Sequence, residues 1–178
     1  MRTGQGLALL VAGGVLVGCA SAPEFSAPLP QKSLVLEKAF AGRTLGQGVF
    51  VNSLTGGETA FSVVIDGNWD GKVLTLVEDF TYRDGSTERK TWRLTKTGDG
   101  TYQGVREDVI GAADVRQDGA GVRMDYYVTL STGIGDIDVR FRDLLYLNAD
   151  GTIANKAVVS KFGLRVGRVD ITMRPQDR

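Results

Sequence analysis

Polar and apolar residues alternate along much of the chain after residue 33. In the run VRMDYYVTL (residues 122–130), the apolar residues and Tyr126 share one parity, and mostly polar residues take the other. The same period of two recurs in residues 74–82, 87–94, 136–141 and 167–173. Because successive side chains of a strand point to opposite faces of a sheet, the pattern predicts strands with one buried face.

Dipeptides that accept a positive φ separate these runs, as tight hairpin turns require. They are Gly56-Gly57, Asp66-Gly67, Asp84-Gly85, Asp99-Gly100, Asp118-Gly119 and Asp150-Gly151. Their spacing predicts about nine or ten strands and one short helix over residues 33–39. Since each turn joins runs that are neighbours in the sequence, we expect an all-β, antiparallel, up-and-down, lipocalin-like barrel rather than a sandwich. Such a barrel has room for side chains and one small ligand.

The first residues have the pattern of a secretory signal peptide. Arg2 precedes an apolar stretch over residues 7–17 that is too short to cross a bilayer as a helix. Leu16-Val17-Gly18-Cys19 then resembles a bacterial lipobox, and Cys19 is the single cysteine of the chain. We expect residues 1–18 to be removed and Cys19 to be acylated. The alternative is a buried cysteine within a helix.

Residues 19–32 are expected to form a lipidated, proline-rich tether ahead of a single domain over residues 33–178. Pro23, Pro28 and Pro30 disfavour helix and sheet, and the alternative is a partly ordered strand that lies on the domain. With Ala20 after the cysteine, and a Gram-negative host assumed, sorting to the periplasmic face of the outer membrane is expected. The acyl chains make the membrane a partner of this protein.

Charge and composition narrow the possible functions. Lys plus Arg and Asp plus Glu number 21 each, so a basic surface for nucleic acid is not expected. The chain has no histidine, which excludes Ser-His-Asp and Cys-His catalysis and histidine-dependent zinc sites. It also lacks a phosphate loop and a nucleophile elbow. We therefore expect no metal, no cofactor and no enzymatic activity.

Several polar residues share the parity of apolar neighbours. Glu78 would face the interior with Leu76 and Phe80, where a carboxylate needs a partner or a raised pKa. Arg106 and Asp108 could pair with each other or with Glu78. Together with Trp92, Tyr102 and Tyr126 these residues are the candidates for holding a ligand. The competing interpretations are a buried ion pair that closes one mouth of the barrel, and aromatic side chains that only fill the core.

A series of segments resembles an uncharacterised bacterial lipoprotein family, domain of unknown function 3833. The segments are Phe40-Ala41-Gly42, Gly67-Asn68-Trp69, Leu76-Val77-Glu78-Asp79-Phe80, Gly100-Thr101-Tyr102-Gln103-Gly104, Asp108-Val109-Ile110-Gly111, Asn155-Lys156-Ala157 and Ser160-Lys161-Phe162-Gly163. The family has no established activity. The resemblance implies a lipid context, since its members tend to be encoded near fatty-acid-modifying enzymes. Residues 142–145 depart from its pattern, which has a tryptophan there.

Three classes of function remain open. The first is an outer-membrane-anchored, non-catalytic periplasmic lipoprotein that binds a lipid or other small apolar ligand. The second is a structural or assembly partner in the envelope, with a filled barrel. The third is a carboxylate-based enzyme acting on lipid-derived substrates. A cavity of several hundred Å³ would favour the first, and a barrel filled by aromatic side chains would favour the second.

Overall fold

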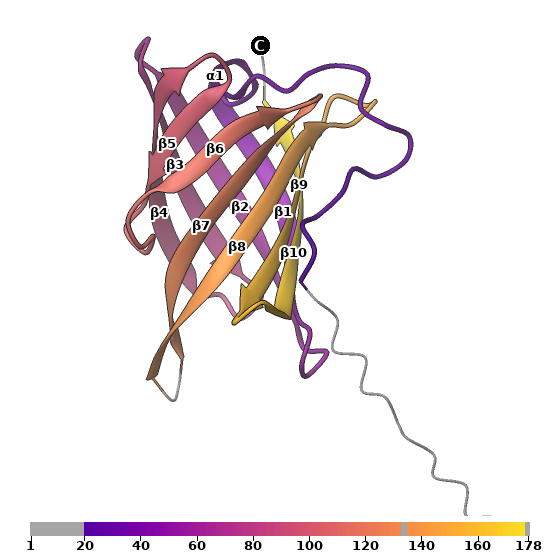
Figure 1. The fold of residues 1–178 in the computed structure, drawn as a ribbon, viewed down its shortest axis with the longest axis vertical. Helices are drawn as coiled ribbons and strands as arrows, with labels where there is room; N and C mark the ends of the chain where they lie inside the picture. The colour runs from indigo at the N-terminus through magenta and orange to yellow at the C-terminus, as the bar shows by residue number, and fades with distance from the viewer. Residues whose placement is uncertain (1–19, 133–134, 177–178) are drawn as a thin grey trace, which may run out of the picture.

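The computed structural model describes residues 20–132 and 135–176, in which ten antiparallel strands close into a barrel (Figure 1). The predicted signal peptide over residues 1–18 and the predicted acylation site at Cys19 lie outside the described residues. The strands are β1 (Gly42–Asn52), β2 (Glu58–Trp69), β3 (Val73–Tyr82), β4 (Thr87–Gly98), β5 (Thr101–Val105), β6 (Ala113–Asp118), β7 (Gly121–Thr132), β8 (Gly135–Leu147), β9 (Ile153–Lys161) and β10 (Leu164–Pro175). Each strand pairs with its neighbour in sequence, and β1 pairs with β10 to close the wall. The predicted up-and-down barrel is therefore confirmed.

One end of the barrel is closed by the short helix α1 (Leu36–Ala39), which lies at the top of Figure 1. Leu34, Leu36 and Phe40 are almost fully buried there. The helix is shorter than the predicted span of residues 33–39. Its apolar side chains stabilise the fold because they fill the end of the barrel and remove that end from water.

Gly67 lies within β2, so the predicted turn at Asp66-Gly67 is wrong. A Cβ atom on Gly67 would lie 1.8 Å from the carbonyl oxygen of Phe40, where the chain enters the barrel beside α1. The turn comes after the end of β2 at Trp69, where Gly71 has φ +99° and the Asp70 carboxylate accepts the N–H groups of Lys72 and Val73 at 2.8 and 2.7 Å. The glycine at position 67 thus serves a close approach of two backbones rather than a reversal of the chain.

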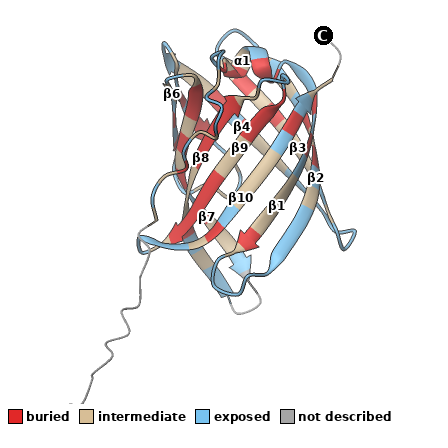
Figure 2. Cartoon of the chain, turned by 90° about the vertical axis from the view of Figure 1, so that its right-hand side faces the viewer, coloured by how far each residue is buried: buried red, intermediate tan, exposed pale blue. Residues whose placement is uncertain are grey.

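The segment before α1 packs along the outside of the barrel over β8 and β9 (Figure 2). Arg123 donates to the Pro23 carbonyl at 2.8 Å, and the Phe25 ring meets the Tyr146 ring edge-on at 5.4 Å. Lys156 also donates to the hydroxyl of Ser26. Residues 20–26 therefore contact the outside of the barrel, as irregular chain rather than as a strand, while Leu29 beyond them is 71% exposed.

No helix among the described residues is long and apolar enough to cross a bilayer.

Candidate functional site

A cavity of about 360 Å³ lies inside the barrel below α1. Its apolar lining comes from all around the wall: Phe50, Phe61, Val63, Ile65, Leu76, Phe80, Leu94, Met124, Leu130, Phe141, Leu145, Val169, Ile171 and Met173. Two further lining residues, Thr59 and Glu88, are exposed and stand at the end opposite α1. The cavity is thus closed by the helix at one end and opens at the other.

Arg106 is the central charged residue of this cavity. Arg106 follows the end of β5, in the connection to β6, and its side chain lines the cavity. Its guanidinium carbon lies 4.7 Å from the centroid of the Trp92 ring and 5.7 Å from that of the Tyr126 ring. This arrangement places a cation against two aromatic faces in a site largely removed from water, where cation–π attraction is strongest.

Carboxylates on either side neutralise Arg106. Its Nε donates to Asp108 Oδ1 at 2.6 Å, and its Nη1 lies 3.8 Å from Glu78 Oε2. Lys90 donates to the other oxygen of Asp108 at 2.7 Å. Burial raises the pKa of Asp108, but the hydrogen bonds and charges of Arg106 and Lys90 outweigh it, so this pKa is lowered overall. Asp108 therefore remains ionised between two cations.

Glu78 has the opposite balance. Burial raises its pKa to about 7, against the attraction of Arg106 and Lys90, which lowers it. The 3.8 Å separation from Arg106 is too long for a hydrogen bond, so this cation compensates only part of the cost of removing the carboxylate from water. Glu78 can thus change its protonation state near neutral pH, within an apolar cavity.

A second polar group lines the same cavity at Asp143, on β8. Tyr126 donates to Asp143 Oδ2 at 3.3 Å, and Asn155 donates to the same oxygen at 3.2 Å. Burial raises the pKa of Asp143 to about 6, and the hydrogen bond from Asn155 opposes the rise. Asp143 Oδ1 and Asn155 Oδ1 are buried acceptors without a hydrogen-bond donor among the described residues. Buried acceptors are normally paired, so these two oxygens suit a donor that a ligand or a water molecule brings.

The structure brings most of the sequence candidates together. Glu78, Trp92, Arg106 and Tyr126 all line the cavity. Asp108 is not part of the lining but holds Arg106 in place, which is the pairing that the sequence suggested.

Tyr102 lies apart from this site. Its side chain is buried at the closed end of the barrel, and its hydroxyl donates a hydrogen bond to the Glu37 carboxylate of α1. The same carboxylate accepts a hydrogen bond from Lys96 Nζ at 2.7 Å. Its role is to attach the helix to the wall, and it does not line the cavity.

Sequence reasoning missed Lys90, Asp143 and Asn155. The signal for Asp143 was its parity, because it follows Val139 and Phe141 on the inward face of β8. The predicted alternation covers residues 136–141 and stops before Asp143, whereas β8 continues to Leu147 with the same parity facing inward. Asn155 pairs across the strands with Leu145, which is also inward, so only the strand register reveals it.

The site is an apolar cavity with a few polar side chains in its wall. We call these side chains, Glu78, Arg106, Asp143 and Asn155, the polar band. Within the described part of the chain, no cluster of three or more Cys, Asp or Glu side chains could hold a metal ion. The band contains two carboxyl groups with raised pKa values, an arginine held against aromatic rings, and two free acceptors.

The chain belongs to a protein family of unknown function, DUF3833, whose family model matches residues 14–175. No curated protein matches it. Among solved structures it is similar to a redesigned beta barrel, mFAP1, bound to DFHBI, at 11% sequence identity and a TM-score of 0.40. That match covers 78% of this chain and 97% of the designed one.

Proposed function

We propose that this protein is a lipid-anchored, non-catalytic binding protein that holds a lipid or another small apolar ligand inside its barrel. The observation that carries the proposal is the cavity of about 360 Å³ with an apolar wall and a buried polar band. Ligand sites typically enclose about 300–1,000 Å³ and combine apolar walls with a few polar groups that orient the ligand. The volume is near the lower limit of this range, which favours a single chain or ring system.

The polar band suggests how such a ligand would be oriented. A hydroxyl or amide N–H of the ligand would satisfy the free oxygens of Asp143 and Asn155. The apolar part would lie against the aromatic and aliphatic walls, and water would leave both surfaces on binding. The void also weighs against a barrel that is only a filled scaffold.

The compartment and the anchor are part of the proposal. Acylation of Cys19 would attach the domain to the membrane, and the sorting expected from Ala20 favours the periplasmic face of the outer membrane. The support for this is the lipobox in the sequence.

Binding can be tested with cis-parinaric acid, a fluorescent fatty acid that accepts energy from tryptophan. Trp92 lines the cavity, so excitation of tryptophan should produce probe emission when the probe is bound. Ala157→Phe places a ring in the cavity and should weaken probe binding at least tenfold. Ala60→Phe makes the same change at an exposed position on β2 and should leave binding unchanged. Equal binding by the two variants, or no binding by the unchanged protein, would contradict the proposal.

A carboxylate-based enzyme is a second candidate because Glu78 has a pKa of about 7 and lines the cavity. A general acid or base works best when its pKa lies near the ambient pH. The two proposals are separated by incubating the protein with fatty acids and fatty acyl esters. Chemical conversion that disappears in Glu78→Gln while probe binding persists would favour the enzyme.

A further inference from the structure

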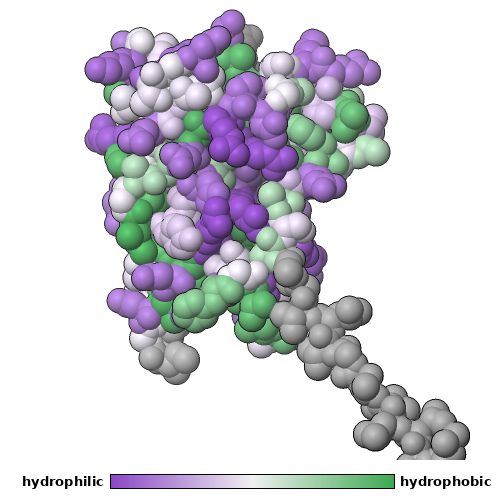
Figure 3. Space-filling view, in the orientation of Figure 1, coloured by the Kyte–Doolittle hydropathy of each residue, from purple (hydrophilic) through white to green (hydrophobic). Residues whose placement is uncertain are grey.

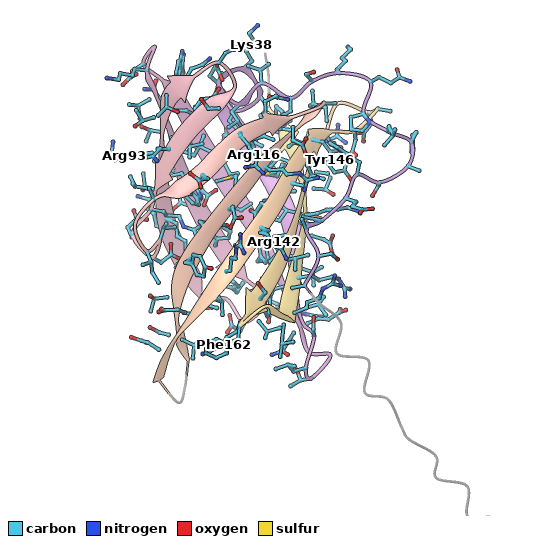
Figure 4. The ribbon with its side chains drawn as sticks, in the orientation of Figure 1. Lys38, Arg93, Arg116, Arg142, Tyr146 and Phe162 are labelled. Atoms are coloured by element: carbon cyan, nitrogen blue, oxygen red, sulfur yellow. The ribbon has the colours of Figure 1, made fainter. Side chains whose placement is uncertain are left out.

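The open end of the barrel carries large apolar side chains on its turns. Leu54, in the turn between β1 and β2, is 76% exposed, and Phe162, between β9 and β10, is 93% exposed. Leu164 begins β10 beside Phe162 and is 47% exposed. Figure 3 shows apolar residues gathered along this lower end, and Figure 4 places Phe162 there.

Phe162 is a poor residue for its turn if the turn faces water. It has φ +50° and Gly163 has φ +77°, in a two-residue hairpin that pairs Lys161 with Leu164. Such hairpins favour Asn or Gly at the first position, because a bulky side chain is disfavoured at positive φ. Neither the turn geometry nor solubility accounts for phenylalanine, so an apolar environment around the tip would explain it.

The chain reaches the barrel at the same end. The N–H of Ala20 donates to the carbonyl of Gly163 at 3.1 Å, and Arg142 donates to the carbonyl of Ala20. Figure 4 labels Arg142 on β8. One peptide bond joins Ala20 to Cys19, and consecutive Cα atoms lie about 3.8 Å apart. The described chain therefore starts beside the hairpin of Phe162, one residue after the position whose acylation is proposed.

We propose that the open end of the barrel docks on a lipid bilayer, with Leu54, Phe162 and Leu164 in its interfacial layer and the cavity mouth facing the lipid. This proposal rests on the proposed acylation of Cys19 and extends the proposed function, because the ligand would pass between bilayer and cavity without crossing bulk water. A bilayer fits better than a protein partner since the apolar tips stand on separate turns, beside the start of the anchor.

Charge makes little contribution to this docking. The exposed charged residues near the open end include both signs, with Arg83 and Arg165 basic and Glu58, Asp84 and Asp136 acidic. Apolar insertion, rather than attraction to anionic lipids, would therefore hold the end on the bilayer. Its orientation should be nearly independent of salt concentration.

The orientation can be tested on the acylated protein in vesicles of phosphatidylethanolamine and phosphatidylglycerol. Cys19 is the single cysteine, so acylation leaves Leu54→Cys as the one free thiol for an environment-sensitive nitrobenzoxadiazole label. The matched control is Ala149→Cys, in an exposed turn at the closed end. We expect the emission of the label at position 54 to shift to the blue on vesicles, while that at position 149 stays at its value in water.

A second variant tests the role of Phe162. Phe162→Asn suits the turn, so the barrel should remain folded, but the blue shift of the label at position 54 should decrease. The anchor is measured separately by flotation with the vesicles. A protein that floats but shows no shift at position 54, or a shift at position 149, would overturn the orientation alone.

Failure of the anchor is distinguishable from failure of the orientation. If the protein does not float and Cys19 itself takes the label, acylation is wrong and the docking proposal is wrong with it. Probe binding in the cavity is a third and independent measurement, because it requires no vesicle.

Discussion

Replacing Glu78 by glutamine tests the physical account of the cavity, because it removes the ionisable group but keeps the shape. Burial raises the pKa of Glu78 from 4.5 to about 7. When the pKa of an acid is higher in the folded state, the folded protein binds protons more tightly than the unfolded chain. The resulting stabilisation is fully present below pH 4.5 and is lost as the pH rises through about 7.

The magnitude follows from the size of the shift. Each pKa unit corresponds to about 1.4 kcal/mol, so the ionisation of Glu78 costs the folded state about 3 kcal/mol once the pH exceeds 7. The other carboxyl groups are present in both proteins, and their titration largely cancels in a comparison. Relative to wild type, Glu78→Gln should therefore gain about 3 kcal/mol of stability between pH 4.5 and 8.

Urea unfolding at a series of pH values measures this difference. Wild type and Glu78→Gln are compared at each pH, and Glu58→Gln provides a control at an exposed position of β2. Only Glu78→Gln should show a difference from wild type in the free energy of unfolding that grows as the pH rises. Parallel curves for wild type and Glu78→Gln would refute the reasoning, because the carboxyl group would then be solvated or fully compensated by Arg106.

Three further predictions concern the α1 end of the barrel, the segment that packs on the outside of its wall, and the anchor. Gly67→Ala should lower the free energy of unfolding by about 2–3 kcal/mol, since its Cβ would collide with the Phe40 carbonyl; unchanged stability in urea would show that α1 shifts at no cost. Phe25→Ala removes an aromatic contact worth about 1 kcal/mol, so trypsin should cleave after Lys32 about fivefold faster while the barrel stays intact; an unchanged rate would mean that other contacts hold the segment. Cys19→Ala should leave unacylated precursor by mass spectrometry, and normal acyl labelling would refute the lipobox.

The fold could be predicted from the sequence because the parity of apolar residues and the turn dipeptides agree with each other. The same parity identified Glu78, which shares a face of β3 with the apolar Leu76 and Phe80, and Arg106 with Asp108 beyond the end of β5. Parity does not give the position of a residue along the barrel axis, however. Tyr102 faces inward as expected, but it lies at the closed end and binds Glu37 of α1.

The errors come from contacts that are distant in the sequence. Asp66-Gly67 has the composition of a turn, yet Gly67 is needed because the Phe40 carbonyl approaches it. Asn155 meets Asp143 only through the register of β8 and β9. The proline-rich segment has no pattern that indicates its partner, and it packs on the barrel through Phe25 and Tyr146.

The most direct test of a ligand in the cavity is native mass spectrometry of the protein purified from the cells that produce it, followed by extraction of what it holds. The account predicts one apolar molecule per chain, retained by Ala60→Phe and absent from Ala157→Phe, in which the cavity is filled. A protein that carries no such molecule and takes up none from its host's lipids, or an equal load on both variants, would contradict the claim that the barrel is a binding site.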